Sequence, residues 1–187
     1  MSLQLTAPPA IEPVTLGEAK AHLKLDTDAD DDLVTRLISA ARARAEWHLG
    51  RALVTQSWIL WLDCWPCDGI VEIPLPPLQS VASVTTYALD DSATVLDASL
   101  YQVDTSASPA RLAFKSNTVP PTNLRRINAL AIAFAAGYGD AASDVPPGIR
   151  EAILELIAFL YEHRGEAPAE LPLDCLALLA PYRILNL

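Results

Sequence analysis

Two cysteines separated by two residues, Cys64-Trp-Pro-Cys67, form the pattern most typical of a chemical site in this chain. A redox-active pair needs its first thiolate at the N-terminus of a helix that follows a strand. A strand pattern precedes Cys64, but Asp68-Gly69 and another strand pattern follow Cys67, so the stabilising helix is missing. A zinc site would need two more ligands, and the remaining candidates lack paired spacing: Cys175, His22, His48 and His163. The pattern therefore favours a hairpin turn with incidental cysteines, without a redox or metal centre.

The most acidic stretch runs from Asp26 to Asp32 and could suggest a cation loop. Asp26, Asp28 and Asp30 occupy the first, third and fifth positions of a calcium-binding loop. Asp31 then stands where that loop needs glycine, and Leu37 stands where it needs a bidentate glutamate. We therefore interpret the stretch as an N-cap cluster whose carboxylates favour the positive end of the following helix.

No combination of residues requires an enzyme. His163 could act as a base, but at a helix C-terminus a histidine more often complements the helix dipole. A nucleophile elbow, a phosphate-binding glycine loop and a zinc-protease helix motif are all missing from the sequence. We predict no catalytic residue, no cofactor and no metal.

Composition restricts the kinds of partner. The 187 residues suit one domain, or one domain with a large insertion, and the net charge of −10 disfavours general attraction to nucleic acid. Hydrophobic residues make up 51% of the chain, which predicts apolar surface buried against protein partners. The N-terminus lacks the pattern of a signal peptide, and the longest uncharged apolar run, Ala129 to Tyr138, is too short for a membrane span.

The strongest secondary-structure signal is a helix over about 146–164, which we call the hub helix. Pro146 and Pro147 suit its first turn, and Gly165 suits a left-handed C-cap. At 100° per residue, Glu151 and Glu155 fall on one narrow stripe with Glu162, while apolar residues cover most of the circumference. Such a helix must be covered on several sides, so we expect the earlier elements to pack around it.

Two helices are expected before it. Thr15 and Glu18 form a capping-box pattern that opens a short helix, and a second helix is predicted from about Asp31 to Leu49, ending at Gly50. The second helix carries the basic patch of an acidic chain, formed by Arg36, Arg42 and Arg44, with Arg51 just beyond. These arginines can be interpreted as a solvated face or as a patch that binds a partner.

Between the second helix and the hub helix the pattern changes to alternating, β-branched and aromatic segments. Strands are predicted at 55–62, 69–73, 81–87, 100–104, 111–114 and 129–134. The fold class is therefore α+β, a small helical bundle around the hub helix with a β-rich insertion. We expect one domain with four parts: N-terminal helices at 1–53, with an extended arm over 1–13; the β-rich insertion at 54–139; the hub helix at 140–164; and a hinge with a docking segment at 165–187.

The C-terminal segment from about Leu173 to Leu187 is predicted to dock on a partner rather than to join the core. Gly165, Pro168 and Pro172 separate it from the hub helix. Its apolar side chains are too extensive to leave in water. The candidate partner-binding residues are Leu176, Leu179, Tyr182, Arg183, Ile184 and Leu185, together with Arg36, Arg42 and Arg44.

Several motifs, in this order, make the chain similar to a known family. The sequence resembles the head–tail connector (adaptor) proteins of tailed phages, prophages and gene transfer agents over nearly its whole length. The motifs that carry the resemblance are Val14–Leu23, Asp31–Ala41, Gly50–Leu53, Gly137-Tyr-Gly139, Val145–Ile153, Tyr161-Glu-His-Arg164 and Leu178–Arg183. The Cys64 and Cys67 pair departs from the family pattern.

The resemblance implies a structural protein of a virion or virion-like particle, made in the bacterial cytoplasm. Such a connector forms a homo-oligomeric ring that contacts the portal protein on one side and a tail-side connector or stopper protein on the other. DNA passes through the ring without sequence-specific binding, and no membrane is involved. The alternative is a cytosolic ligand-binding protein or small enzyme that uses the β-rich section as a pocket.

Overall fold

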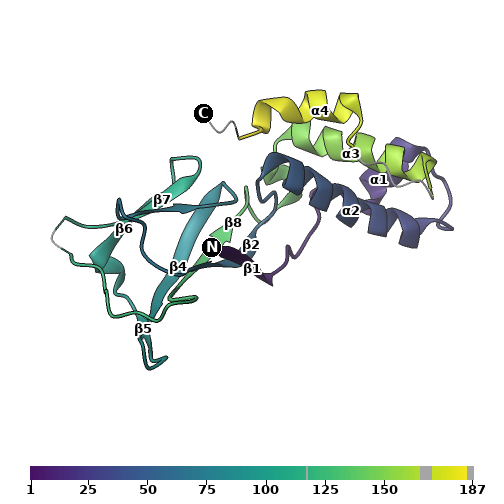
Figure 1. Cartoon of the computed structure of the whole chain (residues 1–187). Helices are drawn as coiled ribbons and strands as arrows, with labels where there is room; N and C mark the ends of the chain where they lie inside the picture. Colours follow the sequence, from purple (N-terminus) through teal and green to yellow (C-terminus); the bar gives the residue numbers. More distant parts are fainter. Residues whose placement is uncertain (117, 165–169, 185–187) are drawn as a thin grey trace. The chain divides into compact units, whose positions relative to one another are not determined.

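The computed structural model of the chain describes residues 1–116, 118–164 and 170–184 (Figure 1). Two compact units can be distinguished, and each combines two separate parts of the sequence. The β unit comprises Met1–Pro9 and Thr55–Tyr138, and the helical unit comprises Ala10–Val54 and Gly139–Leu187. Helices and antiparallel strands are thus segregated, and the predicted α+β class is confirmed.

The larger sheet of the β unit has five antiparallel strands in the order β1-β2-β8-β4-β5. Its central strand is almost entirely apolar, with Leu130, Ile132 and Phe134 fully buried, as a strand between two neighbours requires. The strands are β1 (Ser2–Ala7), β2 (Gln56–Leu62), β8 (Leu130–Ala136), β4 (Leu78–Tyr87) and β5 (Ala93–Val95).

A second sheet has three antiparallel strands in the order β3-β7-β6. Side chains alternate between its faces, so Val71, Ile73 and Leu112 are buried while Glu72 and Arg111 point outward. These strands are β3 (Ile70–Ile73), β7 (Ala110–Phe114) and β6 (Tyr101–Asp104), the last preceded by a 3₁₀ turn at Ala98–Leu100. All six strands predicted from the sequence are present, although β4 begins three residues earlier than expected.

The expectation of an extended N-terminal arm over residues 1–13 is correct only in part. Residues 2–7 are extended, as expected, but they form the edge strand β1, with Leu3 opposite Leu60 of β2. Alternation of Leu3, Leu5 and Ala7 with polar residues suits a strand, and Pro8-Pro9 ends it. The β unit therefore begins at the N-terminus of the chain instead of at residue 54.

The described residues of the helical unit form four helices, two of which begin or end at the residues that the sequence predicts. The Thr15 hydroxyl accepts from the Glu18 amide at 3.2 Å, and the Glu18 carboxylate accepts from the Thr15 amide at 2.8 Å, which confirms the capping box. Gly50 ends α2 with a φ of 64°. The helices are α1 (Leu16–Leu23), α2 (Asp31–Leu49), α3 (Pro147–Glu162) and α4 (Leu173–Leu179), with 3₁₀ turns at Ala142–Asp144 and Ala180–Tyr182.

The hub helix of the sequence analysis corresponds to α3. It begins at Pro147 and contacts α1, α2 and α4. Ile149, Ile153, Leu156 and Ile157 are fully buried, and each such side chain contributes about 1.5–3 kcal/mol to folding. The helix ends at Glu162, and the predicted stop at Gly165 lies outside the described residues.

The expectation that Leu173–Leu187 stands apart from the core is wrong for α4. This helix packs on α3, and both Cys175 and Leu179 are about 1% exposed. The Cys175 thiol donates to the carbonyl oxygen of Ala152, at 3.6 Å. One apolar face of α4 is thus covered by its own helical unit, and Leu179 is a core residue instead of a partner contact.

The longest helix, α2, is rich in charged residues. In the part of the chain that the structure describes, no helix combines the length and the apolar character needed to cross a bilayer.

Candidate partner-binding surface

Among the residues of the helical unit that the structure describes, Trp47 is the most exposed large apolar side chain, at 87% exposure. It lies on the outer stripe of α2, where Arg36, Ala40 and Ala43 are also exposed. Their spacing of four, three and four residues places them on one side of the helix, opposite the buried Val34, Ile38, Ala41, Ala45 and Leu49. A tryptophan held in water on a rigid helix is typical of a protein-binding surface.

A groove of about 340 Å³ lies beside Trp47. One wall comes from α2 through Arg44, Trp47 and His48. The other comes from Glu170 and Leu171, just before α4, and from Leu176 of α4. Apolar side chains thus line a hollow that has the basic Arg44 on one side and the acidic Glu170 on the other. Such a groove fits a protein segment that carries apolar side chains flanked by polar ones.

The C-terminal end of α2 gathers positive charge. Burial of His48, together with the nearby Arg183, lowers the pKa of the imidazole below its ordinary value of 6.5, so the ring is neutral at pH 7. The Arg51 side chain donates to the carbonyl oxygen of Tyr182 at 2.7 Å and ties the chain after α4 to this end of α2. A Cβ placed on Gly50 would lie 3.7 Å from the Ile184 side chain, so Ile184 also lies here.

The structure therefore brings five of the nine predicted partner-binding residues to one end of α2. These are Arg44, Leu176, Tyr182, Arg183 and Ile184. Arg36 is exposed nearer the other end of the helix. Leu185 lies outside the described residues.

Arg42 has an internal role. Its guanidinium donates to Glu12 and to Glu46, both at 2.7 Å, and it joins the segment before α1 to α2. Its side chain is only 15% exposed, and the side chains of Glu12 and Glu46 are 29% and 15% exposed. This pairing leaves the Arg42 guanidinium directed at its own helical unit.

Trp47 was missed in the sequence analysis, although a signal for it is present. The apolar face of α2 contains Leu33, Val34, Leu37, Ile38, Ala41, Ala45 and Leu49. Trp47 falls on the opposite side of a 3.6-residue helix, so an aromatic residue occupies the polar face. That mismatch between residue type and helix face was sufficient to predict an exposed aromatic side chain.

The acidic cluster lies at the other end of α2. Lys20 pairs with Asp28 and Asp31, at 2.6 and 2.7 Å, and the Tyr161 hydroxyl donates to Asp30 at 2.5 Å. Asp30 of the predicted N-cap cluster is the N-cap residue, although its side chain makes no cap hydrogen bond. Asp31 and Asp32 lie in the first turn, where their charge favours the helix dipole.

Within the part of the chain that the structure describes, one group of residues could accept a cation. His22 of α1 meets Glu151 and Glu155 of α3, with their ligand atoms within 4.8 Å of one another. The His22 Nε2 lies 3.9 Å from the nearer Glu155 oxygen, and Glu151 is exposed. This is the stripe of glutamates predicted from the sequence, and its exposure to water resembles a solvated acidic surface more than a closed metal site.

The cysteines lie in contrasting environments. Cys64 and Cys67 are exposed, with free thiols, in the turn between β2 and β3, and a strand follows them as the sequence predicts. Burial raises the pKa of the Cys175 thiol to about 11, so this thiol stays protonated. A reactive thiolate requires the opposite shift.

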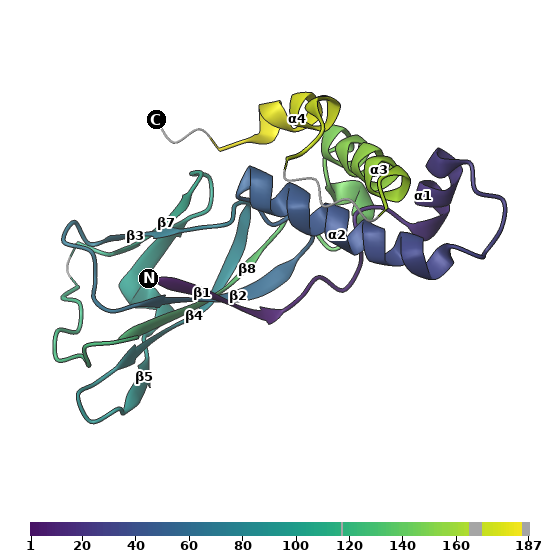
Figure 2. The same ribbon diagram turned by 45° about the vertical axis from the view of Figure 1, so that its right-hand side comes forward.

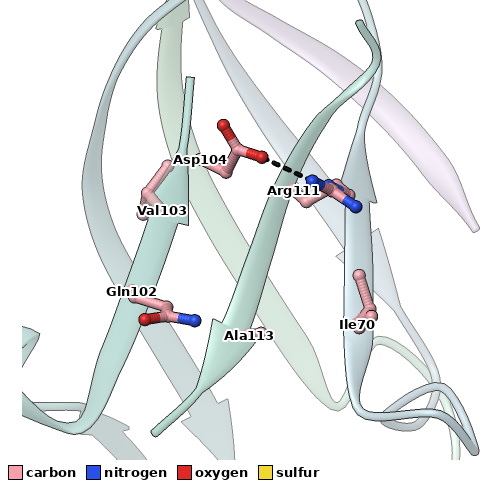
Figure 3. A pocket seen from close by; sticks show the side chains of 6 residues that line it. All are labelled: Ile70, Gln102, Val103, Asp104, Arg111 and Ala113. Carbon is pink, nitrogen blue, oxygen red and sulfur yellow. Dashed lines mark hydrogen bonds and ion pairs between the residues drawn. The ribbon is translucent and has the colours of Figure 1, made fainter. Parts of the chain in front are cut away.

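The alternative hypothesis of a ligand pocket in the β unit can be compared with an open hollow on the three-stranded sheet. Side chains on the outer face of the three-stranded sheet line an open hollow, with Asp104 and Arg111 bonded to each other at 2.6 Å (Figure 3). Bonds from Ser106 and Arg111 hold the pKa of Asp104 well below its ordinary value. The two charged groups of the hollow thus already satisfy each other.

Known structures share this fold over the full length of the chain. A chain from the neck of an empty gene transfer agent (GTA) particle, computed with C6 symmetry, matches with a TM-score of 0.87 and 22% identity, covering 100% of this chain and 97% of that chain. A chain from the virion of a native GTA particle matches at 0.84 and 22%, and one from a native neck computed with C12 symmetry at 0.80 and 21%, both with the same coverage.

No curated protein matches the chain. The family model described as phage gp6-like head-tail connector protein matches residues 13–118, which is more than half of the sequence. The resemblance drawn from the motifs is thereby confirmed, and the chain belongs to the phage gp6-like head–tail connector protein family.

Proposed function

We propose that this protein is the subunit of a ring between the portal and the tail of a phage or phage-like particle. Full-length likeness to neck chains of GTA particles is the observation that carries the proposal. Those necks were computed with C6 and C12 symmetry, and cyclic symmetry places identical subunits around an axis. The proposed location is therefore the neck of a virion or virion-like particle.

The partners follow from this position. A ring at the neck contacts further copies of itself, the portal protein above it and a tail-side connector or stopper protein below it. The surface beside Trp47, with its groove and basic residues, suits one of these protein contacts. DNA passes through the ring without sequence-specific binding, and the net charge of −10 disfavours adhesion of phosphates to the subunit.

Deletion of the gene for this chain tests the proposal. Electron microscopy of the resulting lysate should show DNA-filled heads and separate tails in place of complete particles. Supplying the wild-type chain from a plasmid should restore complete particles. Complete particles in the deletion strain would refute a connector role.

A further inference from the structure

The strand β1 lies at an edge of the five-stranded sheet, next to β2 (Figure 2). In an antiparallel pair, a strand bonds to its neighbour through the N–H and C=O groups of alternate residues, and the groups of the other residues point away. Within the described residues, no group bonds to this second row of backbone groups on β1. All six residues of the strand are exposed. The outer edge of β1 is thus accessible to another chain.

Four strands lie at sheet edges in the part of the chain that the structure describes: β1, β3, β5 and β6. Proteins prevent unwanted pairing at such edges with charged residues, with proline or with very short strands. β3 contains Glu72, β6 contains Asp104, and β5 has only three residues. β1 contains no charged residue and no proline, and the register of its pairing shifts only after Leu5. Its edge from Ser2 to Leu5 is therefore open to strand addition, unlike the other three edges.

This open edge is preformed, because β1 is fixed on its own sheet. The Trp61 indole donates to the side-chain oxygen of Gln4 at 3.0 Å. The Thr6 hydroxyl donates to the carbonyl oxygen of Ser57, also at 3.0 Å. A preformed edge lowers the entropic cost of binding, because only the added strand must become ordered.

The side chains of β1 indicate which kind of strand fits. Leu3 and Leu5 lie on the face of the sheet that carries the buried Leu60, and they are 37% and 43% exposed. Apolar side chains on the same face of an added strand would cover them. Charged side chains there would find no opposite charge on β1 and would lose hydration. The fitting partner is an extended, uncharged segment with apolar residues at alternate positions.

The edge strands of a second copy fit this description poorly. Pairing of β1 with β1 of another copy has two-fold symmetry, so it stops at two chains and builds no larger ring. It is also small, because an edge of six residues measures about 20 Å by 5 Å, or roughly 100 Å² per chain, against about 800 Å² per chain in a stable complex. The other edges are short or charged. These observations favour a strand from a different protein, one that further contacts also hold in place.

We propose that β1 accepts a strand from a different protein of the neck, an extended and uncharged segment that becomes a sixth strand of the sheet. The inference rests on the proposed function and specifies one contact of the connector with its neighbours. Backbone hydrogen bonds supply the affinity of this contact. Apolar residues that cover Leu3 and Leu5 set its register.

Photo-cross-linking in assembled particles identifies what lies beside β1. The photoreactive residue p-benzoylphenylalanine replaces Ser2 in the full-length chain, and it replaces Ala93 of β5 in the control. Both residues are exposed, on the two opposite edges of one sheet. Irradiation and mass spectrometry should reveal a product that joins position 2 to a different protein of the particle. Position 93 should not give this product.

A charge on the edge should block the contact. Leu5→Lys places a lysine on β1, and Val95→Lys is the matched control on β5, where the side chain is 65% exposed. Each variant is supplied from a plasmid to a strain that lacks the gene. Leu5→Lys should lower the number of complete particles at least about 10-fold, whereas Val95→Lys should restore them. Circular dichroism of the purified chains should show wild-type folding for both.

Four results would overturn the inference: a product that joins only two copies of this chain, no product from position 2 in complete particles, the same product from position 93, or normal particle numbers with Leu5→Lys. The cross-link decides the matter even if the lysine variant does not fold. All four results leave the connector role intact. That role is refuted instead by complete particles in the strain that lacks the gene.

Discussion

The β unit and the helical unit expose apolar side chains in different ways. In the β unit, Leu89, Val95, Val119 and Ile127 are exposed at separate turns and edges, and Leu3 and Leu5 are partly exposed on the edge strand β1. In the helical unit, Trp47 is exposed beside a groove that contains Leu171 and Leu176. Partner binding by side chains therefore depends on whether exposed apolar side chains lie beside a groove. Cys64 and Cys67, the residues that first suggest chemistry, lie in the β unit.

The largest expected effect comes from removing α4. A chain ending at Ala169 loses the buried Cys175 and Leu179 and uncovers part of α3. We expect a loss of about 4 kcal/mol or more in the unfolding free energy, since each buried side chain removed costs about 2–5 kcal/mol. Urea denaturation followed by circular dichroism at 222 nm measures it. A truncated chain with full-length stability would mean that α4 is a detachable docking segment, as the sequence first suggested.

Single substitutions in α3 should come next. Ile153→Ala or Leu156→Ala should lower the unfolding free energy by about 2–5 kcal/mol, because both side chains are fully buried. Glu155→Ala is the matched control and should change the unfolding free energy by less than about 0.5 kcal/mol. Hydrogen exchange should localise the loss to peptides of the helical unit, leaving β8 protected. Equal loss of protection in β8 would show that the two units unfold together.

A smaller, pH-dependent effect is expected at the start of α1. Hydrogen bonds from Thr15, chiefly from its backbone amide, and the ion pair with Arg150 lower the pKa of Glu18 below its ordinary value of 4.5. A lowered pKa means stabilisation that is complete above pH 4.5 and is lost as the pH falls through the folded-state value.

Glu18→Gln keeps the capping geometry but removes the charge. It should cost about 0.5 kcal/mol at pH 7 and progressively less below pH 4. Thermal melts of both proteins from pH 3 to pH 7 measure the difference, with Glu151→Gln as the control. A difference that is constant over this range would exclude a contribution from the Glu18 charge.

The smallest effect is expected in the β unit. Replacing Cys64 and Cys67 with serine should change the unfolding free energy by less than about 0.5 kcal/mol, because both thiols are exposed. Particle assembly should continue, and the purified wild-type protein should contain no stoichiometric zinc by elemental analysis. Zinc at one equivalent per chain, or failure of the serine variant to assemble, would assign this turn a function.

Elements set by local chemistry were predictable from the sequence. The capping box at Thr15 and Glu18, the glycine that ends α2 and the apolar circumference of α3 each depend on residues within a few positions of one another. Pairing of β1 with β2 was not predictable, because it joins residues 50 to 59 positions apart. The attachment of α4 was missed because an apolar helix face looks the same whether it covers its own core or a partner.

The candidate surface was predictable only in part. The sequence identified the basic residues of α2 and the apolar residues after residue 173 as separate features. Only the fold brings Arg44, Leu176 and Arg183 to the same end of α2. Only the structure shows that Leu179 is buried in the core while Leu176 lines the groove. Residue type alone could not make that distinction, since leucine is compatible with a core and with an interface.

Cryo-electron microscopy of the neck in particles that contain this chain tests the central claim most directly. The account predicts a cyclic ring of this chain at the junction of head and tail. Particles whose neck lacks this chain, or holds it without a cyclic arrangement, would contradict the account.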